Sequence, residues 1–365
     1  MLRLSATLPF FKQNTPSSPM ARKRIVDLDF LRGLAILGVL FRHSSWDNNF
    51  ARAGWAGVDL FFVLSGFLVS GLLFSEYKKS GNVRIGRFLI RRGFKIYPTF
   101  YLFLLVAFLV YPRISGSAFP VPNMLSEIFF VQSYFQGCFI HTWSLAIEEH
   151  FYLLLSLFIF IMFSARCITN KPLMISSLLT GILLVILFRL QFVYANRNEE
   201  FVPLFYTHLR MDGMLLGVLL AYLFYFSDSF YRFIEKNRTA LIVLALALIS
   251  PLFYIKAGGF FFNTIGFNLI HLGFGLLVII AAQGRLVAKL TETRLLKPII
   301  NATAYTGVYS YSIYVWHLLF SDIIEKGFHL QTGGLLYLFV TITGGILLSL
   351  LIEQTFIKIR DRLFA

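Results

Sequence analysis

The sequence predicts an all-α fold: a polytopic membrane bundle of about ten transmembrane helices, with both termini in the cytoplasm. Of its 365 residues, 57% are hydrophobic and only 14% are charged, and the mean hydropathy is +0.73. Soluble chains are about half apolar and about a quarter charged, so this composition excludes a soluble domain. The apolar runs are also too long for the alternating strands of an outer-membrane barrel. At roughly 20 residues per span, the apolar residues suffice for about ten helices.

The apolar runs give the expected spans directly, since each is long enough for a membrane helix. They are Asp29–Trp46, Ala56–Glu76, Lys95–Tyr111, Trp143–Ser164, Pro172–Val193, Leu209–Ser227, Thr239–Ile255, Gly266–Gly284, Thr303–Phe320 and Gly334–Phe356. The preceding residues 1–24 mix Pro, Ser, Lys and Arg and are predicted to be a disordered cytoplasmic tail, in which Met20 is an alternative start. Residues 25–365 are predicted to form one ten-span membrane domain.

The net charge of +15 would suggest nucleic acid as a partner in a soluble protein. The basic residues are unevenly distributed, however. Of the 33 Lys and Arg residues, 24 fall in the termini and in alternate connections, whereas five fall in the connections on the other side. By the positive-inside rule this asymmetry places both termini in the cytoplasm. The basic excess therefore reports topology, and no nucleic-acid partner is expected.

Charged residues inside the first expected span are the clearest functional candidates, because an ionisable group in hydrocarbon usually faces a cavity. Arg32 and His43 are about three full turns apart, so they share one helix face with a rise of about 16 Å between them. Asp29, one turn before Arg32, is placed to hold its guanidinium. A histidine is the usual general base near neutral pH. The alternative is that Arg32 reaches the headgroups and His43 caps the span.

Four further blocks follow this pair along the chain. Together the five resemble the acyltransferase-3 family of integral-membrane acyltransferases in content, order and spacing. The blocks after the Arg32 and His43 pair are Gly57–Leu68 (GVDLFFVLSGFL), Trp143–Tyr152 (WSLAIEEHFY), Arg210-x-Asp212 with Gly217, and Tyr309–His317 (YSYSIYVWH).

The resemblance implies a ten-span enzyme that takes an acyl group from cytoplasmic acyl-CoA, with acetyl-CoA as the expected donor. The acceptor it implies is a hydroxyl facing outward, commonly on a cell-surface glycan. It also implies that the Arg–His pair of the first span is essential, so Arg32 and His43 are the expected catalytic residues, with His43 as general base toward the acceptor hydroxyl. An acyl-histidine intermediate is the alternative.

Glu148 completes the expected catalytic set. It lies about one turn inside the fourth expected span, where a lone carboxylate needs a partner. His43, near the same outer end, is the expected partner, and a carboxylate there would orient the imidazole. The alternative is that Glu148 pairs with an arginine for packing.

The basic segment before the third expected span departs from the family in one place, since Lys95 stands where members often carry Arg. Lysine keeps the charge but loses the bidentate fork. Arg91 and Arg92 are expected to bind the phosphates of CoA, although a basic interfacial helix also binds anionic lipid. Ser65, in the middle of the second span, is expected to leave space for the pantetheine arm or simply to allow close helix packing.

The remaining candidates lie toward the outer ends of spans and are assigned to the acceptor. Ser144 shares a helix face with Glu148, and Arg210 and Asp212 either hydrogen-bond a sugar or set topology. His317 either lines the acceptor side or packs in the core. The expected acceptor-binding set is Asp29, Trp143, Ser144, Arg210, Asp212 and His317.

No metal site is expected, since a spacing such as H-E-x-x-H is absent from the sequence. The expected partners are membrane lipid and a carbohydrate or lipid-linked glycan acceptor, at the inner or plasma membrane, and no oligomeric state is indicated. The rival reading is a gradient-driven transporter of a sugar or acyl-bearing solute. The two halves of the chain show no corresponding charge pattern, which counts against it. A receptor or scaffold without chemistry would tolerate changes at His43.

Overall fold

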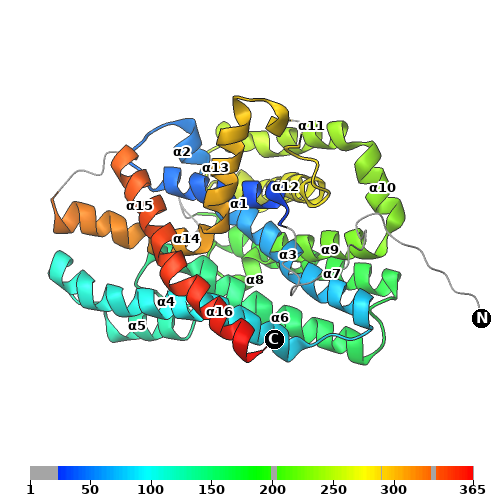
Figure 1. Cartoon of the computed structure of the whole chain (residues 1–365), viewed down its shortest axis with the longest axis horizontal. Helices are drawn as coiled ribbons and strands as arrows, with labels where there is room; N and C mark the ends of the chain where they lie inside the picture. The colour runs from blue at the N-terminus through cyan, green and yellow to red at the C-terminus, as the bar shows by residue number, and fades with distance from the viewer. Residues whose placement is uncertain (1–23, 199–203, 289, 330–333, 365) are drawn as a thin grey trace, which may run out of the picture.

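The computed structural model describes residues 24–198, 204–288, 290–329 and 334–364. Within these residues all regular secondary structure is helical (Figure 1). The disorder predicted for residues 1–24 concerns residues that, apart from Arg24, lie outside the described part of the chain.

The helices are interrupted by several short 3-10 and π turns. In chain order the elements are α1 (Val26–Arg42), α2 (Asn49–Ala53), α3 (Ala56–Ser80), α4 (Ile85–Ser115), α5 (Val121–Ile128), η1 (Ile140–Thr142), α6 (Trp143–Ser164), α7 (Lys171–Ala195), α8 (Thr207–Arg210), α9 (Asp212–Phe226), α10 (Asp228–Lys236), α11 (Arg238–Ile249), η2 (Ser250–Phe253), η3 (Phe262–Gly266), α12 (Phe267–Ala282), η4 (Leu290–Glu292), α13 (Leu296–Val308), α14 (Ser310–Asp322), η5 (Ile323–Gly327), α15 (Gly334–Leu348), η6 (Ser349–Glu353) and α16 (Gln354–Leu363).

Six helical segments of the described chain are long and apolar enough to cross a membrane. They are α3, α4, η1 with α6, α7, η3 with α12, and the run from α15 to α16. A seventh is possible if α9 and α10, which meet at a bend of 102°, count as one broken span. Several spanning helices in one chain make a multi-pass membrane protein.

Each of the ten expected spans overlaps helical structure, but several differ from the prediction, three of them as follows. α1 has only 17 residues, and α4 begins at Ile85, ten residues before the expected start. The expected spans are defined by apolar runs, so the charged segment of α4 that precedes Lys95 was not included in the third expected span. The ninth expected span is two helices, α13 and α14, which meet at Tyr309.

The break at Tyr309 lets the two halves of the ninth expected span pack against different helices. α13 packs against α1, whereas α14 packs against α15. The approach to α1 is so close that a Cβ on Gly307 would lie 1.9 Å from the backbone oxygen of Asp29. A single straight helix could not follow both partners.

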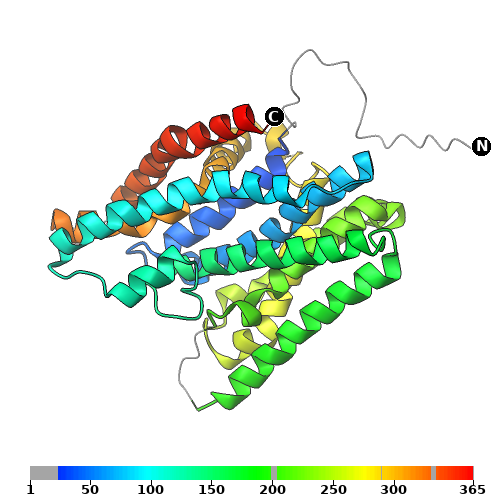
Figure 2. The same ribbon diagram turned by 90° about the horizontal axis from the view of Figure 1, so that it is seen from below.

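α3 lies at the centre of the bundle and packs against α1, α6, α9 and α12. Its contact with α9 is the most intimate and depends on two glycines. A Cβ on Gly66 would lie 2.0 Å from the backbone oxygen of Met214, and a Cβ on Gly217 would lie 2.3 Å from that of Val63. Small residues permit such backbone contact between membrane helices. On another side of the molecule, α16 lies along α4, which extends for much of the long axis (Figures 1 and 2).

We expect Gly217→Ala to destabilise the protein, because the added methyl group must push α3 and α9 apart. Overpacking of this kind costs about 1–3 kcal/mol. Thermal unfolding of the detergent-solubilised protein, followed by circular dichroism, should show a lower melting temperature. Gly86→Ala is the matched control, since a Cβ there meets nothing within 4 Å and alanine favours the helix. A Gly217→Ala variant as stable as wild type would show that the α3–α9 contact tolerates separation.

Candidate active site

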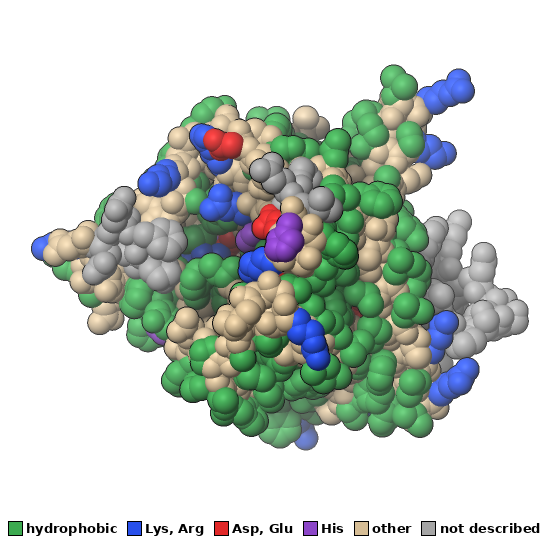
Figure 3. Space-filling model, turned by 90° about the vertical axis from the view of Figure 1, so that its left-hand side faces the viewer, with side chains coloured by type: hydrophobic (Ala, Val, Ile, Leu, Met, Phe, Trp, Pro, Cys, Tyr) green, Lys and Arg blue, Asp and Glu red, His purple; other side chains and the backbone are tan. Residues whose placement is uncertain are grey.

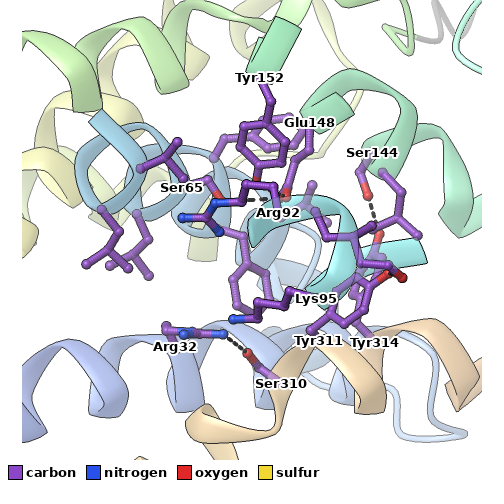
Figure 4. A pocket seen from close by; sticks show the side chains of 18 residues that line it. Arg32, Ser65, Arg92, Lys95, Ser144, Glu148, Tyr152, Ser310, Tyr311 and Tyr314 are labelled. Carbon is purple, nitrogen blue, oxygen red and sulfur yellow. Dashed lines mark hydrogen bonds between the residues drawn. The ribbon is translucent and has the colours of Figure 1, made fainter. Parts of the chain in front are cut away.

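A cavity of about 150 Å³ lies between α1, α3, α4, α6 and α14. Its apolar wall comes largely from α3. Its polar side chains converge from all five helices (Figure 4). They are Arg32, Ser65, Arg92, Lys95, Ser144, Glu148, Tyr152, Ser310, Tyr311 and Tyr314.

Three cations give the cavity its electrostatic character. Arg92 and Lys95 are three residues apart on α4 and so project from one face of that helix. Arg32 reaches in from α1 and donates a hydrogen bond from its NH2 group to Ser310 Oγ, at 3.1 Å. The Arg92 guanidinium lies over the ring of Tyr152, 5.4 Å from its centroid. Such a set of cations favours an anionic ligand.

Glu148 is the carboxylate within the cavity wall. Its Oε1 accepts a hydrogen bond from Ser65 at 3.3 Å, and its Oε2 accepts one from the Tyr152 hydroxyl at 2.7 Å. The predicted pairing of Glu148 with His43 is therefore wrong in this structure. The two side chains lie at different levels of the bundle. Glu148 faces inward between α3 and α4, whereas His43 lies beyond the C-terminal end of α1.

Lys95 has a second carboxylate behind it, which the sequence reasoning missed. Its Nζ lies 4.0 Å from Glu353 Oε1, and Glu353 is only 3% exposed. Glu353 lies in the π-helical turn η6, where Ser349 Oγ donates a hydrogen bond of 2.8 Å to Glu353 Oε2. π turns of this kind occur frequently at functional sites. The glutamate is thus positioned to balance Lys95 from outside the cavity lining.

A second concavity, of about 420 Å³, adjoins the first and lies between the end of α3 and the start of α4. We call it the basic groove. Its charged lining residues are Glu76, Lys79, Arg84, Arg87, Arg91 and Arg92. Arg92 lines both the basic groove and the cavity. Of the predicted donor-binding residues, Arg91 lies in the groove, Ser65 in the cavity and Arg92 in both.

His43 is the C-cap residue of α1, and it does not line the cavity. The prediction that Arg32 and His43 share one cavity wall therefore holds only for Arg32. The exposed His43 ring lies 5.1 Å from that of His317, which in turn lies 4.9 Å from that of His141. The face toward which α1 runs, on the left in Figure 1, is hollowed, and histidine and charged side chains gather there (Figure 3).

Tyr314 stands between the cavity and these histidines. Its hydroxyl donates a hydrogen bond to the backbone oxygen of His141 at 2.8 Å and lies 2.6 Å from Ser144 Oγ. Its ring is 5.5 Å from that of His317. Ser144 thus lines the cavity as predicted for a binding residue, but it is engaged by Tyr314. Fully buried His317 does not face open space.

Arg210 and Asp212 belong to a buried ionic network rather than to a surface that could meet a sugar. Asp59 Oδ1 accepts hydrogen bonds from Arg210 at 2.7 Å and from His271 Nε2 at 2.8 Å. Asp212 Oδ2 accepts one from Arg189 at 2.9 Å and lies 3.2 Å from His271 Nδ1. All five side chains are at most 5% exposed. Burial costs a charged group so much that it must find a partner inside the protein.

Two further predictions for the acceptor set are not met. In the described chain Asp29 and Arg32 do not form an ion pair within 4 Å, and the Arg32 guanidinium donates a hydrogen bond to Ser310 Oγ. Trp143 does not line the cavity; it packs against the rings of Phe62 and Phe205, with the Arg210 guanidinium 5.5 Å from its centroid. Trp143 therefore has a structural environment.

Comparison with known proteins agrees with this membrane architecture. A family model described as an acyltransferase domain, that of the acyltransferase-3 family, matches residues 25–354. The chain belongs to the acyltransferase-3 family. A Staphylococcus aureus (strain COL) protein named "Putative O-acetyltransferase SACOL0978" is 28% identical over 331 residues, covering 83% of this chain and 51% of that protein.

A second relative, "O-acetyltransferase OatA" of Staphylococcus aureus (strain NCTC 8325 / PS 47), is 29% identical over 314 residues. The match covers 80% of this chain and 49% of OatA. The chain thus spans about half the length of the curated relatives it matches. No solved structure matches the chain.

Several residues that the structure brings together had no role assigned from the sequence. The cavity residues are Tyr152, Ser310, Tyr311 and Tyr314, and the network residues are Asp59, Arg189 and His271. The signal for the network was present, because each of its members is a charged or ionisable residue within an apolar run. The tyrosines lie within the motif blocks Trp143–Tyr152 and Tyr309–His317, but tyrosine is common in apolar helices, and the spacing did not single them out.

We expect Asp59→Ala to destabilise the fold strongly, since it leaves Arg210 and His271 buried without their carboxylate. Removing one partner of a buried pair costs about 3–5 kcal/mol. Thermal unfolding in detergent should show the loss. Asp47→Ala is the control, because Asp47 pairs with Arg52 at an exposed surface and should leave the melting temperature unchanged. Equal melting temperatures for both variants would contradict a structural role for the network.

Proposed function

We propose that this family member is an integral-membrane O-acyltransferase that moves an acyl group, acetyl in the first instance, from cytoplasmic acyl-CoA to a hydroxyl of an outward-facing glycan or other surface acceptor. Family membership and the names of the relatives support acyl transfer to oxygen. The proposal adds three points to family membership: the acyl-CoA donor, the transfer of the acyl group from the cytoplasmic to the outer side, and the class of acceptor.

The observation that carries the proposal is that Arg92 lines both the basic groove and the cavity. Acyl-CoA has a highly charged nucleotide end and a long, thin arm that ends in the thioester. The groove offers several cations for the phosphates, and charge-assisted hydrogen bonds to phosphate are strong. The cavity has a largely apolar wall from α3, which suits the arm. The residues of the groove therefore fit the charge of the donor.

The acceptor side of the proposal rests on His43. It is exposed, and its ring has no hydrogen-bond partner among the described residues, so one face is open to an incoming hydroxyl. About 16 Å along the axis of α1 separates it from Arg32. The donor arm is proposed to span this distance past Tyr314. We assign Glu148 to the donor cavity, where Ser65 and Tyr152 hold it.

The reaction proposed is an acyl exchange at one carbonyl carbon. His43 takes the proton of the acceptor hydroxyl while that oxygen attacks the thioester carbonyl. The carbon–sulfur bond then breaks, and the proton passes from His43 to the departing thiolate. An acyl-histidine route would place the acyl group on His43 first and then on the acceptor. Both routes need the His43 ring nitrogen.

A transporter is the rival function, and it makes a different prediction for the donor. A carrier moves its solute without consuming a thioester, whereas the proposed enzyme releases free CoA. Membership in an acyltransferase family favours the enzyme.

His43→Ala should abolish acceptor-dependent release of CoA, because the variant lacks the base; a positioned base contributes roughly 100-fold or more. The assay follows free CoA from acetyl-CoA with a crude glycan acceptor, using purified protein and checking folding by thermal unfolding. The control is His208→Ala, an exposed histidine that bonds Tyr134 away from the cavity. CoA release that survives His43→Ala would move the chemistry to another residue. If the wild-type protein releases no CoA from acetyl-CoA or from longer acyl-CoAs, the result would contradict the enzyme and favour the transporter function.

Arg92→Gln should raise the KM for acetyl-CoA more than Arg91→Gln does, because Arg92 faces both the groove and the cavity. Losing one charge-assisted contact weakens donor binding by roughly tenfold or more. Initial rates at varied acetyl-CoA give the KM. Arg113→Gln, at the other end of α4, is the matched control and should leave it unchanged. An unchanged KM in Arg92→Gln would argue against a donor path through this residue.

A further inference from the structure

Three imidazoles from distant parts of the chain meet at the end of α1. His43 follows α1, His141 lies in η1 and His317 lies on α14. The ring centroids of His43 and His317 are 5.1 Å apart, and those of His317 and His141 are 4.9 Å apart. The described residues contain no cluster of His, Cys, Asp or Glu suited to a metal ion. Two of the rings, those of His141 and His317, make hydrogen bonds to backbone oxygens.

Backbone carbonyls decide which nitrogen of each buried ring carries the proton. His317 Nδ1 lies 2.6 Å from the backbone oxygen of Tyr314, and His141 Nε2 lies 3.1 Å from that of Val315. A carbonyl oxygen only accepts, so each of these nitrogens must be the N–H donor. In the neutral ring the other nitrogen then keeps its lone pair. His317 thus presents Nε2, and His141 presents Nδ1, as hydrogen-bond acceptors.

Both of these acceptor nitrogens are buried without a partner among the described residues. His317 is 0% exposed and His141 is 3% exposed. Buried polar atoms are nearly always hydrogen-bonded, so two such atoms side by side need an explanation. The His43 ring, next to His317, is the nearby group with an N–H to give and without a partner in the described chain.

We propose that His317 positions His43 for acyl transfer by accepting a hydrogen bond from the His43 ring at Nε2. A centroid distance of 5.1 Å is compatible with an N–H···N bond once the nitrogens face each other, because that bond needs about 3 Å between them. The bond fixes the tautomer of His43. Its other nitrogen then points its lone pair at the acceptor hydroxyl.

This inference rests on the proposed function and gives His317 a role other than binding the acceptor. His43 takes the hydroxyl proton on its free nitrogen while the acceptor oxygen forms its bond to the acyl carbon. The bond to His317 stabilises the imidazolium that results, as an acceptor behind a catalytic histidine does in general. The proton then leaves His43 for the CoA thiolate as the carbon–sulfur bond breaks. His317 neither gains nor loses a proton.

The test compares two substitutions at His317. His317→Phe keeps a flat ring of similar size without the lone pair, whereas His317→Gln keeps an acceptor oxygen at about the distance of Nε2. We expect His317→Phe to lower kcat by at least ~10-fold, since a positioned base contributes roughly 100-fold or more. The KM values for acetyl-CoA and acceptor should stay unchanged. His317→Gln should recover part of kcat. His208→Phe is the matched control, and thermal unfolding checks that each variant folds.

A second measurement needs no acyl donor. Diethyl pyrocarbonate acylates the free nitrogen of a neutral imidazole, and mass spectrometry gives its rate at His43. The hydrogen bond to His317 makes that nitrogen more nucleophilic, so the rate should fall in His317→Phe and recover in His317→Gln. If wild type proves inactive with all acyl-CoAs, the proposed function fails and this rate alone decides whether His317 orients His43.

Three results would overturn the inference while leaving the proposed function intact. The first is a wild-type kcat in His317→Phe, which would show that the ring only fills space. The second is a raised KM for the acceptor with kcat unchanged, which would make His317 a binding residue. The third is a folded His317→Gln variant as slow as His317→Phe.

Discussion

Asp59 is held by two hydrogen-bond partners at once, and the position of α3 depends on that arrangement. Arg210 comes from α8 and His271 from α12, so the carboxylate joins three helices deep in the bundle. Two turns farther along α3, Ser65 and Leu68 line the cavity. A carboxylate in an apolar bundle cannot be hydrated, so it must keep its hydrogen-bond partners, and this fixes the position of its helix relative to theirs. The shape of the cavity therefore depends on the position of α3, which is fixed by a network whose side chains do not line the cavity.

The long helix α4 links the surface of the molecule with its interior. Its first turns carry cations that lie in the basic groove, and Arg92 and Lys95 carry the same charge into the cavity. These charges also explain why Glu353 is buried nearby, since a lysine in the interior needs a counter-ion. Cations thus line both the open groove and the cavity, and the cavity adds one carboxylate, Glu148, and a largely apolar wall from α3.

Composition and apolar runs predicted the helical class and the location of the helices, because membrane burial imposes a strong and local pattern on a sequence. Arg32, Arg92, Ser65 and Glu148, four of the residues singled out from the sequence, line one cavity, although the sequence analysis paired Glu148 with His43 and did not group the four together. The partners of these residues were not predictable. Arg32 bonds Ser310, which is 278 positions away, and no periodicity records a pairing of that kind. His43 was misplaced for a simpler reason: sharing a helix face with Arg32 does not make a cavity long enough to reach both.

The π-helical turn at Ser349–Glu353 sets the register of the last helix. A π turn holds one residue more than an α turn, so everything after it is rotated by about 100° relative to an unbroken helix. Before the turn, α15 packs on α14; after it, α16 packs on α4. The turn thus divides a long helix into two parts that face different neighbours, and the glutamate at the end of the turn, Glu353, lies toward Lys95. Deleting one residue from the π turn would therefore restore a uniform α-helix and rotate the Glu353 carboxylate away from Lys95.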